Sequence, residues 1–435
     1  MKRKLKKKYR ILFILIILVI VVFLFLLNNK DKKNNETSTK TNNTIDYVSI
    51  ISEKIDIDSN FIKWIDNNYK DSLKKLNGLL DNKEYDKNMW HEVTGYSYLV
   101  LNDLYNNKYS NMDNVKIIES NSPSTLSFTG DISLAEDMRV IKKYYSNNNI
   151  NSILSEDMLN IMKDSDLLTI NSEFTFSNRG SKLNGKLYTL RAKPENIKIF
   201  KEIGVDLVTL ANNHVYDYGK DAFFDTLDTF DNNGITRVGA GHNLDEAMKP
   251  QYFIINGYKI GIVNASRAEK YRFTPGATNN SEGIFLCYDS ENVLNLIKEI
   301  RNETDYIIAI YHYGKENYHE LEEEQILLSR KSIDQGADVV VGHHAHTLQG
   351  VEMYNSKPII YNLGNFLFNQ NEIETALFKI ILNDNGTMDY YMIPALQNNG
   401  YTDVLNGERK QKVINDINSW SINALIDENG KINIK

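Results

Sequence analysis

Residues 339–346, Val-Val-Val-Gly-His-His-Ala-His, place three histidines directly after a short run of β-branched residues. Four more apolar runs end in a polar side chain that can bind a metal or carry a proton. The four endings are Thr129-Gly130-Asp131 after residues 126–128, Asn171-Ser172-Glu173 after 167–170, Ala211-Asn212-Asn213-His214 after 207–210, and His312 after 306–311. Helix-length amphipathic stretches alternate with these runs from about residue 124, which predicts βαβ units and an α/β fold.

The polar endings are expected to meet in one place, because sites in α/β sheets lie beyond the carboxyl ends of the strands. Carboxylate, carboxamide and neutral imidazole groups suit Zn, Mn, Fe or Mg. Residues two apart on an extended chain face the same way, so His344 and His346 can hold one ion together, as can Asn171 and Glu173. A single residue of this kind is usually a loop or cap residue, but five such endings together predict a metal site or an active site.

Neighbouring residues on an extended chain point in opposite directions, which predicts different tasks for Asn213 and His214, a ligand and a proton donor. Asp217 follows closely and precedes a helix-like run that ends at residue 234. Two interpretations of Asp217 stay open, the N-cap of that helix and a member of the site.

Three basic residues, Arg179, Arg191 and Lys193, lie between the second and third endings. They are candidates for a local positive charge that offsets the acidic body of the chain, and ordinary solvated surface charge is the alternative.

The N-terminus contains 17 successive residues, 11–27, drawn only from Ile, Leu, Val and Phe. A bilayer span needs ~17–25 such residues, whereas the apolar core of a signal peptide has ~7–15. No alanine precedes Ala135 to form a signal cleavage site, and seven Lys and Arg lie within the first ten residues. The pattern predicts an uncleaved transmembrane signal anchor with a cytoplasmic tail, residues 1–10, and an extracellular remainder. A cleaved signal peptide is the alternative.

The rest of the chain divides by composition. Residues 28–44 contain no apolar side chain and are expected to form a flexible linker. Residues 45–120 have helix-like spacing and predict a small helical module, in which His91 packs or lies at the surface. The α/β domain then covers residues 124–435, and within it residues 376–382 and 388–393 flank Asn-Asp-Asn-Gly and predict an antiparallel hairpin.

Charge and cysteine content exclude some function classes. Beyond the first ten residues, 43 basic side chains face 57 acidic ones, so the body has no electrostatic basis for binding nucleic acid. The single cysteine, Cys287, excludes an internal disulfide framework and a thiolate metal cluster.

Several stretches of the chain together resemble the CapA/PgsA family, the membrane-anchored capsule proteins of poly-γ-glutamate synthesis. They are Gly130-Asp131, residues 206–219 with Ala-Asn-Asn-His, His312-Tyr313-Gly314, residues 336–349 with Gly-His-His-Ala-His, and residues 357–366. The resemblance covers roughly residues 124–395.

That family resembles the calcineurin-like metallophosphoesterases, which implies a four-layer αββα sandwich, here preceded by the transmembrane helix and the helical module. The resemblance also implies a site. In it, Asp131 is similar to the first metal ligand, Asn171 or Glu173 to the bridging ligand, Asn213 and His312 to further ligands, His344 and His346 to the closing pair, and His214 to the catalytic histidine. Apart from the resemblance, Asp217 is a candidate catalytic residue, and Arg191 and His343 are candidates for binding the substrate.

The chain departs from the phosphoesterase pattern at three positions. Ser133 stands where those enzymes have the histidine of Asp-x-His, the bridging position is Glu or Asn instead of Asp, and His343 replaces a glycine. One divalent ion or two (Mn, Zn, Fe or Mg) are therefore both open.

The resemblance implies a membrane-anchored extracellular protein that acts in the synthesis, export or retention of poly-γ-glutamate, through a metal-dependent hydrolase-type site where His214 protonates the leaving group. The expected partners are the membrane, capsule synthase or export subunits, and the anionic polymer or its precursor. The alternatives are a non-catalytic scaffold subunit of a capsule complex and a general extracellular metallophosphoesterase.

Overall fold

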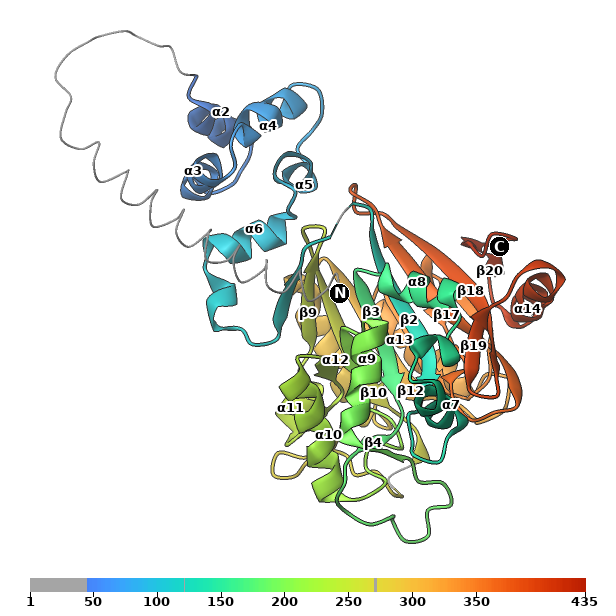
Figure 1. Cartoon of the computed structure of the whole chain (residues 1–435). Coiled ribbons are helices and arrows are strands. Elements are labelled where there is room, and N and C mark those ends of the chain that lie inside the picture. Colours follow the sequence, from blue (N-terminus) through green and yellow to red (C-terminus); the bar gives the residue numbers. More distant parts are fainter. Residues whose placement is uncertain (1–44, 121, 270–271) are drawn as a thin grey trace. The chain divides into compact units, whose positions relative to one another are not determined.

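The computed structural model describes residues 45–120, 122–269 and 272–435 (Figure 1). The chain divides into two compact units, Met1–Tyr47 and Val48–Lys435. The second unit holds nearly every described residue and all of the sheets that the structure describes.

Two large sheets form the body of this unit. One contains, in spatial order, β1 (Val115–Ile118), β9 (Gln251–Ile255), β10 (Tyr258–Ser266), β12 (Tyr306–Tyr313), β13 (Val339–His344), β15 (Lys357–Ile360) and β14 (Val351–Tyr354). The other contains β19 (Tyr401–Val404), β18 (Met388–Asn398), β17 (Glu372–Leu382), β2 (Ser124–Ile132), β3 (Leu167–Ser172), β6 (Leu207–Thr209) and β7 (Thr236–Val238), with β16 (Asn365–Leu367) paired to β2. Short pairs are β4 (Thr175–Phe176) with β5 (Arg191–Ala192), β8 (Ala240–Gly241) with β11 (Gly283–Ile284), and β20 (Ala424–Ile426) with β21 (Ile432–Ile434).

The central strands of both sheets are parallel, and this arrangement positions the site. β10, β12, β13 and β15 run together in one sheet, and β2, β3, β6 and β7 in the other. Their carboxyl ends carry the polar endings of the sequence, because each ending follows its apolar run directly.

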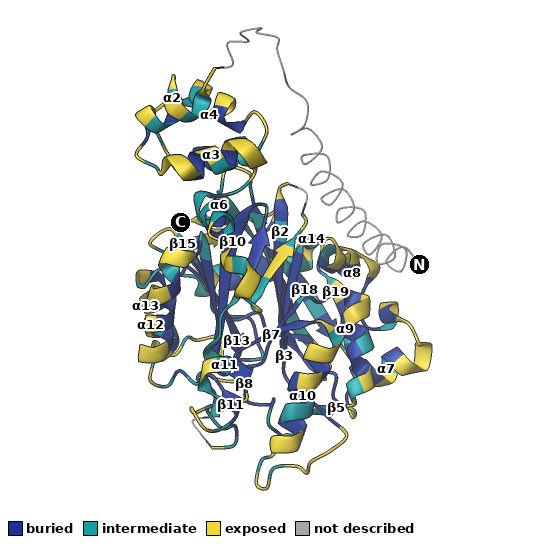
Figure 2. Cartoon of the chain, turned by 90° about the vertical axis from the view of Figure 1, so that its left-hand side faces the viewer, coloured by how far each residue is buried: buried dark blue, intermediate teal, exposed yellow. Residues whose placement is uncertain are grey.

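The two sheets pack face to face through one apolar core. Phe128 and Leu126 of β2 and Phe378 of β17 meet Ile262 of β10 and Ile310 of β12 there. These strands are apolar almost throughout because both of their faces are covered, one by the other sheet and one by helices. Figure 2 shows the strands as largely buried and the helices as exposed on one side.

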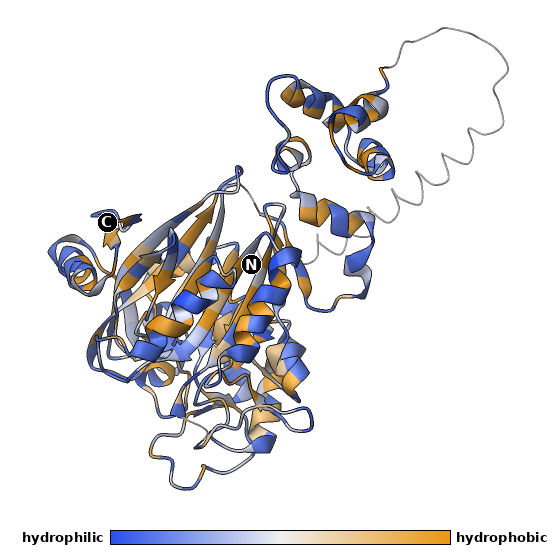
Figure 3. Cartoon of the chain, turned by 180° about the vertical axis from the view of Figure 1, so that it is seen from behind, coloured by the Kyte–Doolittle hydropathy of each residue, from blue (hydrophilic) through white to orange (hydrophobic). Residues whose placement is uncertain are grey.

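Helices cover the outer faces of both sheets, and Figure 3 shows their alternating apolar and polar sides. In α12, for example, Val293, Leu296, Ile297 and Ile300 are buried, the spacing of one helix face. The eight-stranded sheet packs against α7 (Arg139–Asn147), α8 (Glu156–Lys163), α9 (Ile197–Ile203) and α10 (Lys220–Asn233), and the seven-stranded sheet against α11 (Leu244–Met248), α12 (Glu291–Ile300) and α13 (Glu323–Asp334). A last helix, α14 (Gly407–Trp420), adds Val413, Ile414 and Ile417 to the core between the sheets.

The predicted hairpin is confirmed. β17 and β18 pair antiparallel from Glu372↔Asn398 to Leu382↔Met388, around the Asn-Asp-Asn-Gly turn. Gly386 has φ 77°, a left-handed conformation that glycine adopts without a steric cost.

The described residues before β1, from residue 45 onward, form short helices. They are α2 (Tyr47–Lys54), α3 (Ser59–Asn68), α4 (Ser72–Leu80), α5 (Met89–Thr94) and α6 (Tyr98–Tyr105). His91 of α5 is buried, stacks on Tyr258 at 4.3 Å and hydrogen bonds to the carbonyl oxygen of Asn256 at 2.7 Å. The predicted packing role of His91 is confirmed. Nearby, Lys259 and Asp103 form a buried ion pair at 2.9 Å.

The predicted transmembrane element is corrected. A bilayer span needs ~20 apolar residues in succession, and none of the helices within the described ranges has that length and apolar character. α10 and α14, the longest of them, have 14 residues each and one polar face. The expected tail 1–10, span 11–27 and linker 28–44 lie outside the described residues. The structure supports a mixed α/β fold with two large sheets; the transmembrane part of the fold prediction and the single-pass membrane location that depended on it are not supported.

A glycine before the first site residue has a steric reason. A Cβ atom on Gly130 would lie 2.0 Å from the carbonyl oxygen of Gly364, the group that accepts the hydrogen bond from the backbone of Asp131 at 2.8 Å. We expect Gly130→Ala to lower the free energy of unfolding by about 3 kcal/mol, the upper end of the usual overpacking cost. Urea denaturation measures it. Gly78→Ala in α4, where a Cβ meets nothing within 4 Å, is the matched control and is expected to stabilise by about 0.5–1 kcal/mol. Equal midpoints for the two variants would contradict this account.

Candidate functional site

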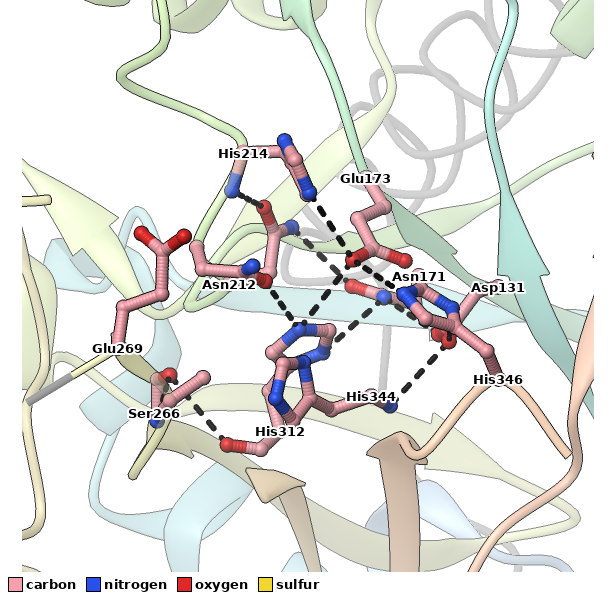
Figure 4. Close-up of polar contacts among 12 residues, drawn as sticks. Asp131, Asn171, Glu173, Asn212, His214, Ser266, Glu269, His312, His344 and His346 are labelled. Carbon is pink, nitrogen blue, oxygen red and sulfur yellow. Dashed lines mark hydrogen bonds and ion pairs between the residues drawn. The ribbon is translucent and has the colours of Figure 1, made fainter. Parts of the chain in front are cut away.

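The polar endings of five strands meet between the two sheets, as the sequence pattern predicts. Asp131 ends β2 and pairs in register with Asn171 of β3, while His312 of β12 pairs with His343 of β13. Figure 4 shows His312 and His344 of the seven-stranded sheet, with His346 just beyond it, facing Asp131 of the eight-stranded sheet and Glu173 just after its strand β3. Side chains from strands that are distant in sequence are therefore neighbours in space. The site residues classed as buried are Asp131, Asn171, Glu173, Asn213, His214, Asp217, His312, His343 and His344.

Glu173 lies at the centre of this group. Its side chain is fully buried, and neither of its oxygens receives a hydrogen bond from any residue that the structure describes. Three imidazole nitrogens surround Oε1: Nε2 of His312 at 3.5 Å and Nε2 of His214 and His346 at 3.9 Å each. Burial, and after it the charge of Asp131, raise the pKa of Glu173 well above its usual value. A buried carboxylate whose oxygens have no hydrogen-bond donor is a fitting ligand for a cation, because a cation would offset the cost of its burial.

The donor set fits one divalent ion. One ligand atom from each of Glu173, His344 and His346 lies within 4.8 Å of the others. Nδ1 of His344 is also buried without a hydrogen-bond partner in the described chain. Two imidazoles and one carboxylate are a common catalytic zinc set and suit Mn and Fe as well.

The backbone of the closing histidines is strained in a way that aims the two rings. His344 has φ 93° and His346 φ 58°, values that residues with a Cβ rarely adopt. Such strain persists where the surrounding structure holds it, commonly at functional sites. The backbone amide of His344 donates to Oδ2 of Asp131 at 3.2 Å. This hydrogen bond links the end of β13 to the end of β2.

The protonation of the two closing histidines differs. Burial and the neighbouring imidazole of His346 lower the pKa of His344 to about 3, so its ring is neutral and able to bind a metal. For His346, burial opposes protonation, but the carboxylates of Glu173 and Asp131 raise the pKa to about 10. Nδ1 of His346 lies 2.9 Å from Oδ1 of Asn365 and 3.4 Å from Oδ2 of Asp131, which leaves Nε2 toward Glu173.

Asn171 holds Asp131 and does not present a free oxygen. Its amide nitrogen donates to Oδ1 of Asp131 at 2.7 Å, and its oxygen accepts from Thr209 at 3.1 Å and Asn212 at 3.2 Å. Burial works against ionisation of Asp131, yet the hydrogen bond from His346 and the nearby imidazoles hold the pKa of this carboxyl below its usual range. Ser133, at the position of the missing histidine, is buried, and no described residue hydrogen bonds to its hydroxyl. A second ion at Asp131 would therefore lack the histidine that the Asp-x-His pattern supplies.

Asn213 and His312 are paired with each other. Nε2 of His312 lies 2.7 Å from Oδ1 of Asn213. Burial and the adjacent ring of His344, at 4.7 Å, lower the pKa of His312 well below its usual value. Both residues border the Glu173 group, so the structure brings all seven predicted ligands to one place.

His214 and Asp217 form a hydrogen-bonded pair. Nδ1 of His214 lies 2.7 Å from Oδ2 of Asp217, and Nε2 faces Glu173. Gly219 is the N-cap residue of α10, so the cap interpretation of Asp217 is wrong and the site interpretation agrees with the geometry. The carboxylate of Asp217 accepts the proton on Nδ1, so Nε2 is the atom through which His214 can exchange a proton with the site.

The contacts of the two predicted substrate residues are with groups other than Glu173. His343 is buried, and its Nε2 is 2.9 Å from the carbonyl oxygen of Thr129, a link between the sheets. Arg191 stacks on the ring of Tyr218 at 4.3 Å, and its backbone carbonyl accepts from Glu136. Arg179 is paired with Asp225 at 2.5 Å, as expected of an ordinary surface charge.

Sequence reasoning missed residues that shape the site. Asn212 accepts the backbone N–H of His214 at 3.0 Å and donates to the carbonyl oxygen of Ser172 at 2.9 Å. Its place in Ala-Asn-Asn-His could have indicated it, since an Asn side chain often bonds to the backbone two residues on. Lys186, which pairs with Asp217 at 2.8 Å, comes from a polar loop and carries no signal in the sequence.

Comparison with known proteins agrees with these motifs. The family model described as the bacterial capsule synthesis protein PGA_cap matches residues 125–370. The PGA biosynthesis protein CapA of Bacillus subtilis (strain 168) is 31% identical over 274 residues, 62% of this chain and 70% of that protein. The capsule biosynthesis protein CapA of Bacillus anthracis is 30% identical over 286 residues, 63% and 67% of the two chains. A probable polyglutamine synthesis accessory protein of Mycobacterium tuberculosis is 27% identical over 207 residues, 46% and 54%. The chain belongs to the family of bacterial capsule synthesis proteins, as its Ala-Asn-Asn-His and Gly-His-His-Ala-His stretches indicated.

Proposed function

We propose that this protein serves poly-γ-glutamate capsule synthesis as a metal-dependent hydrolase acting on the polymer or its precursor. The observation that carries the chemical part is Glu173, a buried carboxylate with both oxygens unpartnered within the described chain, surrounded by imidazoles. The capsule part rests on the family, whose Bacillus members are named for PGA and capsule biosynthesis.

The site residues fall into two groups, those that would hold a cation and those that would transfer a proton. Glu173, His344 and His346 would hold the ion. A divalent cation bound there supplies Lewis-acid polarisation of the scissile group. Asp131 and Asn365 orient His346 through its Nδ1, the kind of outer support that fixes a metal-binding ring.

His214 acts as the proton donor to the leaving group. Its Nε2 faces the centre of the site, and Asp217 holds the opposite nitrogen at 2.7 Å. Donation from Nε2 requires the imidazolium form of His214, whose charge the Asp217 carboxylate stabilises, and the ring returns to the neutral form once the leaving group has taken that proton.

The negative net charge of the chain suggests a second role for the proposed ion, in attracting an anionic polymer. With 57 acidic against 50 basic side chains, the chain repels a polyanion at long range. A divalent cation at the site would reverse the local sign of the potential where the polymer has to approach.

Metal content of the purified full chain tests the proposal, measured by inductively coupled plasma mass spectrometry after incubation with Mn²⁺, Zn²⁺ or Fe²⁺. We expect about one equivalent, since three protein ligands and one open position are typical of a catalytic site. His344→Gln is expected to lose the ion, and His343→Gln, one residue away with its ring on Thr129, to keep it. Protein that stays empty with all three ions would overturn the proposal and favour a non-catalytic scaffold.

Activity is measured on two substrates in parallel, purified poly-γ-glutamate and bis(p-nitrophenyl) phosphate. Metal-dependent shortening of the polymer supports the capsule hydrolase. Turnover of the phosphodiester alone would replace it with a general metallophosphoesterase.

A further inference from the structure

Lys186 is a buried cation in an otherwise exposed loop. The side chains that follow it, Leu187 and Tyr188, are 84% and 70% exposed, whereas the Lys186 side chain is 3% exposed. A lysine is almost never buried without charged partners, because removing its ammonium from water is costly. The burial of this one side chain therefore indicates partners that compensate for the loss of water around its ammonium group.

The ammonium of Lys186 joins three separate segments. It lies 2.8 Å from Oδ1 of Asp217 and 2.9 Å from Oε2 of Glu269, and it donates to the carbonyl oxygen of Asn213. Its position over the ring of Phe273, at 5.7 Å, adds an apolar wall. The loop, the strand ending that carries Asn213, and the segment after β10 thus meet at one atom.

Asp217 is the junction between this lysine and the proton donor. While Oδ1 pairs with Lys186, Oδ2 bonds to Nδ1 of His214 at 2.7 Å and to the amide of Leu190 at 2.6 Å. The carboxylate is fully buried. Removal of the ammonium would leave one buried carboxylate and a nearby second one, that of Glu269, without their cation.

We propose that Lys186 is a positioning residue of the site: it holds Asp217 with one oxygen toward His214 and closes the loop of residues 178–190 against that pair. The catalytic consequence rests on the proposed hydrolytic function, whereas the structural consequence does not. Lys186 acts through Asp217 and touches none of the residues that would hold the ion.

The loop has other attachments, so loss of Lys186 should loosen it without unfolding the domain. The amide of Leu183 donates to the carbonyl oxygen of Asp217 at 3.0 Å, and Leu190 donates to its side chain. Both bonds are available to a Lys186→Met variant, whose methionine fills most of the same volume.

Hydrogen–deuterium exchange on the full chain tests the positioning role. Lys186→Met is expected to raise exchange in peptides covering residues 181–192 by about tenfold or more, because local opening governs exchange. Lys182→Met, an exposed lysine in the same loop, is the matched control and should match the parent protein. Lys186→Arg keeps the charge and should restore most of the protection.

Measurement of kcat is the second test of the proposal. Lys186→Met is expected to lower kcat by about 10–100-fold, the usual effect of losing an outer support, with KM and metal content nearly unchanged. Exchange and kcat in Lys186→Met equal to those of Lys182→Met would overturn the proposal.

If the parent protein has no turnover, the hydrolase proposal fails, and the exchange experiment still decides the role of Lys186. If Lys186→Met does not fold, Glu269→Gln, which keeps the Lys186–Asp217 pair, should give the same loosening to a smaller degree, and unchanged exchange in that variant would count against the proposal.

Discussion

Replacing Glu173 with glutamine will remove metal-dependent stabilisation from this protein. The substitution keeps the shape of the side chain and removes the negative charge around which His312, His214 and His346 are arranged at 3.5–3.9 Å. A ligand that binds only the folded state stabilises it by ~2.7 kcal/mol at a concentration 100 times its Kd. The parent protein is therefore expected to melt at a higher temperature with Mn²⁺ or Zn²⁺ present, and Glu173→Gln is expected to melt at one temperature with and without metal.

The control for this experiment is another buried glutamate. Glu352 is fully buried, but Arg330 at 2.7 Å and the hydroxyl of Tyr361 at 2.6 Å occupy its oxygens. Glu352→Gln should lower the melting temperature because it weakens that network, yet keep the full upward shift with metal. Differential scanning fluorimetry with and without a chelator measures both shifts. A metal response in Glu173→Gln equal to that of the parent would place the ion elsewhere.

Replacing His214 with glutamine will lower kcat steeply while metal stays bound. General acid–base catalysis by one side chain typically contributes 10²–10⁴-fold, so we expect kcat to fall by about that factor. Metal content should not change, because the donor atoms come from Glu173, His344 and His346. Asp217→Asn is expected to cost about 10–100-fold, since it leaves the ring in place but loses its charged support.

His319 supplies the matched histidine control. Its ring stacks on Trp420 at 4.1 Å and bonds to the carbonyl oxygen of Leu348, among residues that line a separate cavity of about 270 Å³. His319→Gln should keep full turnover and full metal content. Unchanged kcat in His214→Gln, measured on whichever substrate the parent protein cleaves, would assign the proton transfer to another group.

The mixed α/β organisation and the convergence of the polar strand ends could be predicted because both depend on local patterns. Apolar runs such as Val339-Val340-Val341, each followed by a polar ending, require strands whose carboxyl ends meet, and β2, β3, β6, β12 and β13 obey this rule. The hairpin of β17 and β18 followed from its turn residues for the same reason. The transmembrane helix, by contrast, rested on composition alone and has no counterpart among the helices that the structure describes.

The sequence by itself determined which side chains gather at the site, since alternation and strand ends are local properties of the chain. Only the tertiary structure decided what each of them does. It turned the oxygen of Asn171 toward Thr209 and its nitrogen toward Asp131, set His343 against Thr129, assigned Asp217 to His214 and not to α10, and brought Lys186 inward from its loop. Each of these roles depends on which hydrogen-bond donor faces which acceptor in the folded chain. The partners can be far apart in sequence, as His343 and Thr129 are, at 214 positions. No local pattern encodes them, because the free energy that selects each pairing is that of burying polar groups together in the folded chain.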